Sequence, residues 1–423
     1  MNNVSAHRAF SFLRTYGYER VSCSKEERTV AEALLNECTS LGVSAQLEEF
    51  TVPCGRVSHA LLRVTSPYVK EYEVTGYERA ASTPEGGLDT EFLYVENADE
   101  VLLEQAKGKI VLVNGYLNRA TYEKLRKAEA AAILTFTGRT IDRESESDLN
   151  RCKLRETLTE PFGAIPVLNM RAASAAEIVR RGAKTVHIEL TGECYDGTSQ
   201  NVCATIPGTD KPSEVITLGG HYDSVYFSSG VHDNLSGSVI VLELLRYFAA
   251  HPPRRTVRFC WFGSEEQGLL GSKAYVKAHA DELKACVAML NFDVAAPTLG
   301  SNHLVTLATD DALHYVTGVL REAGYGVRAK QDTYSSDCIP FADNGVPAIN
   351  LARFGANGAD YMHNRHDSLK SGYLDEHALD ITLQQGFVLL DRLANAASFP
   401  IKREIAPEIR QKVDEYLFKA KKE

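Results

Sequence analysis

Histidine and carboxylate residues follow three apolar runs of the sequence, each at the point where the run ends. The runs are 215–220, 256–262 and 285–292, and the residues that follow them are His221, Asp223, Glu265, Glu266 and Asp293. Imidazole and carboxylate groups without thiolates suit Zn²⁺ or a similar first-row ion whose site stays open for water. The pattern therefore predicts a catalytic metal site instead of a closed structural one.

Two further residues extend this set. Asp233 lies in the segment 230–237, just before a predicted helix, and His363 lies in the loop 361–367. One histidine and one carboxylate for each ion, with a third carboxylate shared, would hold two divalent ions about 3.5–4 Å apart. Because adjacent side chains point in different directions, one acid of the pair 265–266 can bind metal while the other acts as a base.

Each motif also has a plainer interpretation. A pair of glutamates commonly begins a helix, and Asp233 can cap the helix that follows it. These interpretations would require every candidate to follow a strand by chance, so the joint pattern favours the metal site. His232 and His366 stay open as either ligands or neighbours of ligands.

Strands and helices alternate in the C-terminal half of the chain. The predicted strands are 215–220, 256–262, 285–292 and 347–351, and the predicted helices are 236–250, 272–280, 311–323 and 374–394. This alternation predicts an α/β fold with a mostly parallel sheet covered by helices on both faces. The carboxyl ends of such strands form one rim, where ligands bind.

The first half of the chain has a different texture. A helix is predicted near residues 25–35 and a half-buried strand at 43–52, whereas 65–195 contains short strands and turns with few residues that do chemistry. We therefore predict a discontinuous catalytic domain, residues 1–64 and 196–423, with a smaller β-rich α+β domain inserted at 65–195.

The charge and composition of the chain indicate which kinds of partner and location are expected. The chain has 423 residues and a formal net charge of −10, so neither nucleic acid nor an anionic membrane is expected as a partner. No apolar run reaches the roughly 18 residues of a membrane span, and no signal peptide is visible. Nine widely spaced cysteines without a C-x-x-C pair predict neither a disulfide framework nor a thiolate zinc site, which favours a cytoplasmic location.

The joint motif set resembles that of the M28 metallopeptidases, which are co-catalytic zinc exopeptidases with a phosphorylase/hydrolase-like fold. The segments that carry this resemblance, in the family's order, are 219–224, 230–237, 263–272, 291–293 and 363–368. Residues 65–195 are similar to the protease-associated domain that is often inserted in this family.

The resemblance implies a role for each candidate residue. It assigns His221 and Asp293 to one zinc, Glu266 and His363 to the other, Asp233 to the bridge, Glu265 to the general base, and Asp223 to the orientation of His221. Two positions depart from the family's pattern. His232 stands where aspartate is frequent, and both Tyr334 and Tyr361 lie near the expected place of the oxyanion-stabilising tyrosine.

These observations together predict a metallo-aminopeptidase that removes N-terminal residues from peptides, with two Zn²⁺ ions that Co²⁺ or Mn²⁺ can replace. A carboxypeptidase is an alternative, since Arg353 and Arg365 are near enough in sequence to grip a terminal carboxylate. A glutaminyl-cyclase-like enzyme would need only one zinc, which five candidate ligands disfavour. A binding module without catalysis is disfavoured by the presence of Glu265 and all the ligands.

Overall fold

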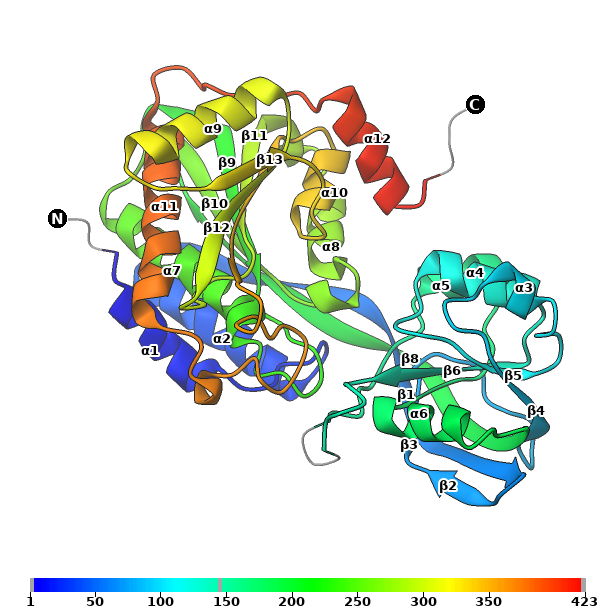
Figure 1. The fold of residues 1–423 in the computed structure, drawn as a ribbon. Coiled ribbons are helices and arrows are strands. Elements are labelled where there is room, and N and C mark those ends of the chain that lie inside the picture. The colour runs from blue at the N-terminus through cyan, green and yellow to red at the C-terminus, as the bar shows by residue number, and fades with distance from the viewer. Residues whose placement is uncertain (1–3, 144–146, 420–423) are drawn as a thin grey trace. The chain divides into compact units, whose positions relative to one another are not determined.

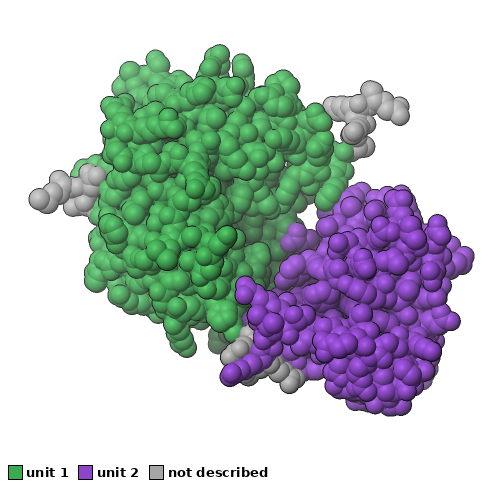
Figure 2. Space-filling model, viewed as in Figure 1, with its two compact units in different colours: residues 1–52, 198–423 green, residues 53–197 purple. Residues whose placement is uncertain are grey.

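The computed structural model describes residues 4–143 and 147–419. The chain forms two compact units, one of residues 1–52 and 198–423 and the other of residues 53–197 (Figure 2). The predicted domains divide at 64/65 and 195/196. The first of these positions lies within β1 (Ser44–Ser66), a continuous strand that begins in one unit and ends in the other. β8 (Thr185–Ile206) does the same on the return path.

The larger unit is built on one mixed, mostly parallel sheet with the strand order β13-β12-β14-β11-β9-β10-β8 (Figure 1). The strands after β8 are β9 (Lys211–His221), β10 (Arg255–Phe262), β11 (Cys286–Phe292), β12 (Gly300–Leu307), β13 (Arg328–Gln331) and β14 (Ala348–Gly355). The central four, β10, β9, β11 and β14, pair in parallel, whereas β8 and β12 run antiparallel to their neighbours β10 and β14. The predicted fold class is thereby confirmed.

Helices cover both faces of this sheet (Figure 1). One face carries α1 (Ala6–Tyr16), α2 (Lys25–Ser40), α7 (Ser236–Ala250), α9 (Asp310–Glu322) and α11 (Glu376–Asn395), and the other carries α8 (Leu270–Ala278), α10 (Cys338–Asp343) and α12 (Pro407–Tyr416). Alternation along β10 shows why two cores form. Phe259 and Trp261 pack in the first core, while Cys260 and Phe262 pack in the second, because successive side chains leave a strand on opposite faces.

The smaller unit has its own cores, and its strands follow β8 in the strand order. The order is β8-β4-β5-β6-β7-β3, in which β4 to β7 pair in parallel. Its other elements are β2 (Lys70–Tyr72), β3 (Val74–Gly76), β4 (Leu88–Tyr94), β5 (Ile110–Leu112), β6 (Ala132–Thr137), β7 (Val167–Arg171), α3 (Glu100–Leu103), α4 (Arg119–Lys127), α5 (Glu156–Phe162) and α6 (Ala172–Arg180). Within the described ranges of the whole chain, no helix has the length and apolar character that crossing a membrane requires.

Candidate metal centre

Three neighbouring strands end at the same edge of the large sheet and deliver polar residues there. His221 is the last residue of β9 and lies opposite Phe262, the last residue of β10, while Asn291 of β11 lies opposite Gly219. Glu265 therefore follows one strand end and Asp293 another, at the same level as His221. Because these three strands are parallel, their carboxyl ends form one rim.

Five residues meet at this rim in two groups that share one member. The donor atoms of His221, Asp233 and Asp293 lie within 4.8 Å of one another, and so do those of Asp233, Glu266 and His363. The carboxylate of Asp233 divides between the groups: Oδ1 is 3.1 Å from His221 Nε2, and Oδ2 is 3.0 Å from His363 Nε2. Asp293 Oδ1 completes the first group at 3.6 Å from His221 Nε2, and Glu266 Oε2 completes the second at 3.2 Å from His363 Nε2.

The donor chemistry and the charges of these groups fit divalent cations. Each group offers nitrogen and carboxylate oxygen without sulfur, the set typical of an open zinc site. Burial raises the pKa values of Glu266 and Asp293, which share the region with Asp233 and Glu265. The Glu266 carboxylate, the largest influence on His363, raises the pKa of that imidazole to about 12. Such a concentration of buried acids calls for positive charge, and two bound cations would supply it.

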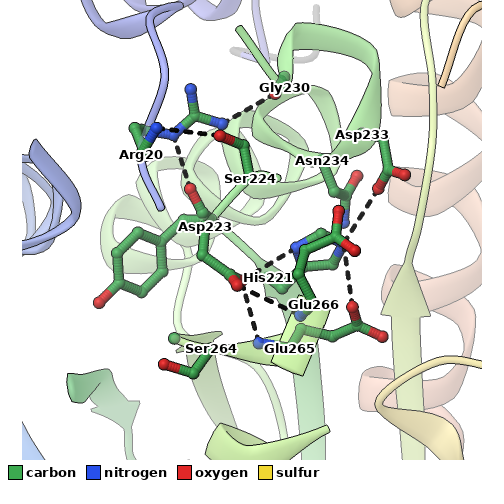
Figure 3. Close-up of polar contacts among 12 residues, drawn as sticks. Arg20, His221, Asp223, Ser224, Gly230, Asp233, Asn234, Ser264, Glu265 and Glu266 are labelled. Carbon is green, nitrogen blue, oxygen red and sulfur yellow. Dashed lines mark hydrogen bonds and ion pairs between the residues drawn. The ribbon is translucent and has the colours of Figure 1, made fainter. Parts of the chain in front are cut away.

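Asp223 contacts both His221, at the end of β9, and the turn after β10 that carries Glu265 and Glu266 (Figure 3). Its carboxylate is fully buried, and Oδ1 lies 3.3 Å from His221 Nδ1, on the opposite side of the ring from Asp233. The same carboxylate accepts hydrogen bonds from the backbone N–H groups of Glu265 at 3.0 Å and Glu266 at 3.2 Å. The sequence suggested only the contact with His221, so the hold on the turn that carries both glutamates is a finding of the structure.

Glu265 lies beside the first group and is almost completely buried. Its Oε2 is 3.9 Å from His221 Nε2, which is too far for a hydrogen bond and near enough for electrostatic attraction. Burial raises the pKa of Glu265 well above its ordinary value. The His221 imidazole opposes this rise, and the carboxylates of Asp337, Glu266 and Asp293 add to it.

Two residues that the sequence did not predict hold loops of the site in place. The buried guanidinium of Arg20 donates to the backbone carbonyls of Tyr222 at 2.6 Å, Ser229 at 2.6 Å and Gly230 at 2.8 Å. Figure 3 shows the bond to Gly230. The buried carboxylate of Asp367 accepts the backbone N–H groups of His232 at 2.7 Å and Asp233 at 3.1 Å. The sequence carries no local signal for this role of Arg20, because these three carbonyls lie about two hundred residues away.

His232 and His366, whose roles the sequence left undecided, lie outside both groups of possible metal ligands. His232 is buried and its Nδ1 donates to the carbonyl of Ala295 at 2.7 Å, while its Nε2 lies 3.6 Å from Asp360 Oδ1. His366 is exposed and packs near the ring of Tyr361, with ring centroids 5.5 Å apart. Neither belongs to a cluster of possible ligands among the described residues.

The two candidate tyrosines differ in their surroundings. Burial raises the pKa of Tyr334 well above its ordinary value, and the carboxylates of Asp293, Asp233 and Glu265 raise it further. The hydroxyl of Tyr361 instead donates to the carbonyl of Gly358 at 2.7 Å.

Arg353, a candidate for binding a substrate's terminal carboxylate, is hydrogen-bonded to other parts of the protein. Its guanidinium donates to the carbonyls of Pro297 at 2.9 Å and Thr298 at 3.3 Å and to Asn302 Oδ1 at 2.9 Å. Only 7% of the residue is exposed, so this arginine ties the β12–β14 region together.

Comparisons with known proteins show similarity to a peptidase family and to zinc aminopeptidases. Residues 201–384 match the family model described as Peptidase family M28. Aminopeptidase YwaD of Bacillus subtilis is 26% identical over 409 residues, which cover 93% of this chain and 84% of YwaD. Carboxypeptidase Q of Mus musculus is 27% identical over 291 residues, which cover 66% of this chain and 62% of that protein.

Among solved structures, the zinc aminopeptidase BSAP from Bacillus subtilis superimposes with a TM-score of 0.78 at 21% identity. The superposition covers 96% of this chain and all of that one. At this level of identity the likeness concerns the fold.

Proposed function

We propose that the chain is a dinuclear zinc aminopeptidase of peptidase family M28, whose model matches residues 201–384. The observation that carries the proposal is the divided carboxylate of Asp233, which contributes one oxygen to each of two His and carboxylate groups. A single tetrahedral ion would not use all five of these residues. The enzyme's substrates would be peptides with a free N-terminus.

His221 and Asp293 would hold one Zn²⁺, Glu266 and His363 the other, and Asp233 would bridge them. Co²⁺ or Mn²⁺ would be substitutes, since they also accept imidazole and carboxylate ligands. When bound, the two ions would lower the pKa of water and polarise the scissile carbonyl. Asp223 would keep His221 in the tautomer whose Nε2 faces the metal.

Glu265 would act as the general base. Its buried carboxylate would accept a proton from the attacking water and return that proton to the nitrogen of the leaving amine. The bond from its backbone N–H to Asp223 would keep the side chain aimed at the rim. Proton transfer of this kind requires a base within hydrogen-bonding reach of the water, so this hold has direct consequences for rate.

Tyr334 would stabilise the oxyanion that develops on the substrate carbonyl. The carboxylates of Asp293, Asp233 and Glu265 help to raise its pKa, which keeps the hydroxyl protonated and able to donate. A donor placed in advance against developing charge is among the largest contributions to catalysis. Tyr361, which already donates to a backbone carbonyl, is the weaker candidate.

Aminopeptidase action is favoured over carboxypeptidase action by the charges near the rim. A carboxypeptidase would need a cationic grip for the terminal carboxylate, and Arg353 is committed to backbone and amide oxygens. The acids Glu265, Glu266 and Asp293 suit a protonated α-amine. We also propose that residues 65–195 are a protease-associated-like insert.

Blocked peptides test the direction of cleavage. One short peptide is prepared with free ends, with an acetylated N-terminus and with an amidated C-terminus, and the products are identified by mass spectrometry. Acetylation should stop hydrolysis and amidation should leave the rate within about twofold. The opposite pattern would overturn the aminopeptidase proposal in favour of a carboxypeptidase. Loss of hydrolysis of the free and the amidated peptide after chelation, with recovery on adding Zn²⁺, verifies that a metal enzyme is being measured.

A further inference from the structure

A buried carboxylate from the N-terminal part of the chain reaches the turn that carries Glu265. It belongs to Glu27, in the first turn of α2, and no part of the reaction described above uses it. Its two oxygens have different partners. Oε2 accepts the backbone N–H of Cys23 at 2.7 Å, whereas Oε1 accepts the hydroxyl of Ser199 at 2.9 Å and the backbone N–H of Ser264 at 3.1 Å.

The Oε2 contact has an ordinary structural explanation. Ser24 caps α2 by accepting the backbone N–H of Glu27 at 3.0 Å, and a glutamate three residues after such a cap commonly reaches back to an exposed N–H at the helix start. Helix capping accounts for one oxygen only. The Oε1 contact with Ser264, 237 positions later in the chain, needs a separate reason.

Ser264 has a backbone conformation that residues other than glycine rarely adopt. Its φ is +54° and its ψ is +33°, in the left-handed region, and it immediately precedes Glu265. Such a residue persists only where its surroundings hold it. Its hydroxyl also contacts the hydroxyl of Ser22, so two residues from the N-terminal part of the chain grip it.

Three successive backbone N–H groups in this turn point at two buried carboxylates. The N–H of Ser264 donates to Glu27, and those of Glu265 and Glu266 donate to Asp223. The preceding residue lets Glu27 come this close, because a Cβ on Gly263 would lie 2.6 Å from Ser199 Oγ and 3.1 Å from Glu27 Oε1. The direction in which the Glu265 side chain leaves the backbone is thus set by both carboxylates.

We propose that Glu27 is a positioning residue for Glu265, acting through the backbone of Ser264. This inference rests on the proposed role of Glu265 as general base. Without an acceptor at Oε1, the Ser264 N–H would be buried and unpaired, and the turn would relax toward a conformation that satisfies it. A displacement of about 1 Å at a catalytic group can cost on the order of 10²-fold in rate.

The test compares Glu27→Met with Ser24→Ala. Methionine fills a similar volume without accepting a hydrogen bond, whereas Ser24→Ala weakens the cap of the same helix and leaves the Ser264 contact intact. For Glu27→Met, we expect kcat to fall at least about tenfold, with KM within twofold and metal content unchanged by elemental analysis. For Ser24→Ala, we expect a lower Tm and an unchanged kcat.

A double-mutant cycle separates positioning from general destabilisation. If Glu27 acts through Glu265, Glu27→Met should reduce kcat no further in a Glu265→Gln background. A full additional loss in that background, a loss of metal from Glu27→Met, or an equal fall in kcat for Ser24→Ala would each overturn the inference. If Glu265→Gln alone keeps the wild-type rate, the proposed function fails instead, and the two failures are distinguishable.

Glu27→Asp provides the same test if the methionine variant does not fold. Aspartate keeps the carboxyl group and withdraws it from Ser264 by one methylene. We expect a fall in kcat with metal content retained. A folded aspartate variant with wild-type kcat would overturn the inference.

Discussion

Replacement of Glu265 by glutamine isolates the chemistry of one carboxylate. Glutamine has nearly the same shape, and the backbone N–H that donates to Asp223 at 3.0 Å is unchanged, so the turn should keep its conformation. The side chain lies 3.9 Å from His221 Nε2 and belongs to neither group of possible ligands. The substitution should therefore remove the proton acceptor while leaving the metal ligands in place.

The expected loss of rate is that of a general base alone, because the metal ligands are unchanged. A positioned general base contributes roughly 10²–10⁴ in rate. At about 1.4 kcal/mol for each factor of ten, this corresponds to about 3–5 kcal/mol of transition-state stabilisation. We expect the loss in kcat, with KM changed by no more than about twofold because ground-state binding is not the target. Steady-state kinetics with saturating Zn²⁺ and elemental analysis of the same preparation measure both quantities.

Glu266→Gln is the matched control, because it makes the same chemical change at the adjacent residue. Glu266 Oε2 lies 3.2 Å from His363 Nε2 within the second group, so this variant should lose metal as well as rate. The reverse result, with metal lost from Glu265→Gln and retained by Glu266→Gln, would mean that the two acids are assigned backwards. A Glu265→Gln enzyme within about threefold of the wild-type kcat would refute the general-base role.

Three further predictions follow from the same site. Chelation should abolish activity and Zn²⁺ or Co²⁺ should restore it, with two metal ions per chain at full activity; full activity with one ion would contradict the dinuclear centre. Tyr334→Phe should lower kcat by about 10²-fold with metal content unchanged, because one oxyanion donor is lost, and a wild-type kcat would exclude that role. Burial, with a contribution from Asp223, raises the pKa of Glu27 to about 8, so its folded form binds a proton that the unfolded chain releases near pH 4–5. The wild type should therefore lose stability relative to Glu27→Gln as pH rises from 5 to 9, and Tm curves that stay parallel across this range would contradict the raised pKa.

The central sheet was predictable because its strands are buried on both faces. Continuous apolar runs such as 256–262 and 285–292 are typical of strands that are buried on both faces. Segments such as 236–250 repeat their apolar residues at the spacing of a helix. Strand β12 and the edge strand β13 were missed. The first four residues of Gly300–Leu307 are only half-buried, and Arg328–Gln331 alternates exposed and half-buried residues without an apolar run. α1 was missed because serine, threonine and aromatic residues weaken its helical signal; packing of Phe10 and Leu13 in the core holds it.

The candidate ligands were predictable for a related reason. Their positions follow strand ends, and the topology of a parallel sheet brings strand ends together whatever the loops do. The residues that support the site were not predictable. Arg20 and Glu27 act on backbone groups more than two hundred residues away, and nothing in the local sequence distinguishes a buried arginine or glutamate from an exposed one. Contacts of this kind are set by tertiary packing.

The discontinuous larger unit imposes an order on biosynthesis. Residues 1–52 leave the ribosome first, yet α1 packs against α7 and α11, and α11 ends only at Asn395. At roughly 5–20 residues per second, translation of the intervening residues 53–197 takes on the order of 10–30 s. Those residues form a continuous unit that can fold during this interval, while α1 waits for α7 until residue 250 and for α11 until residue 395 has been translated. The apolar face of α1 therefore stays without its native partners during synthesis of the intervening unit.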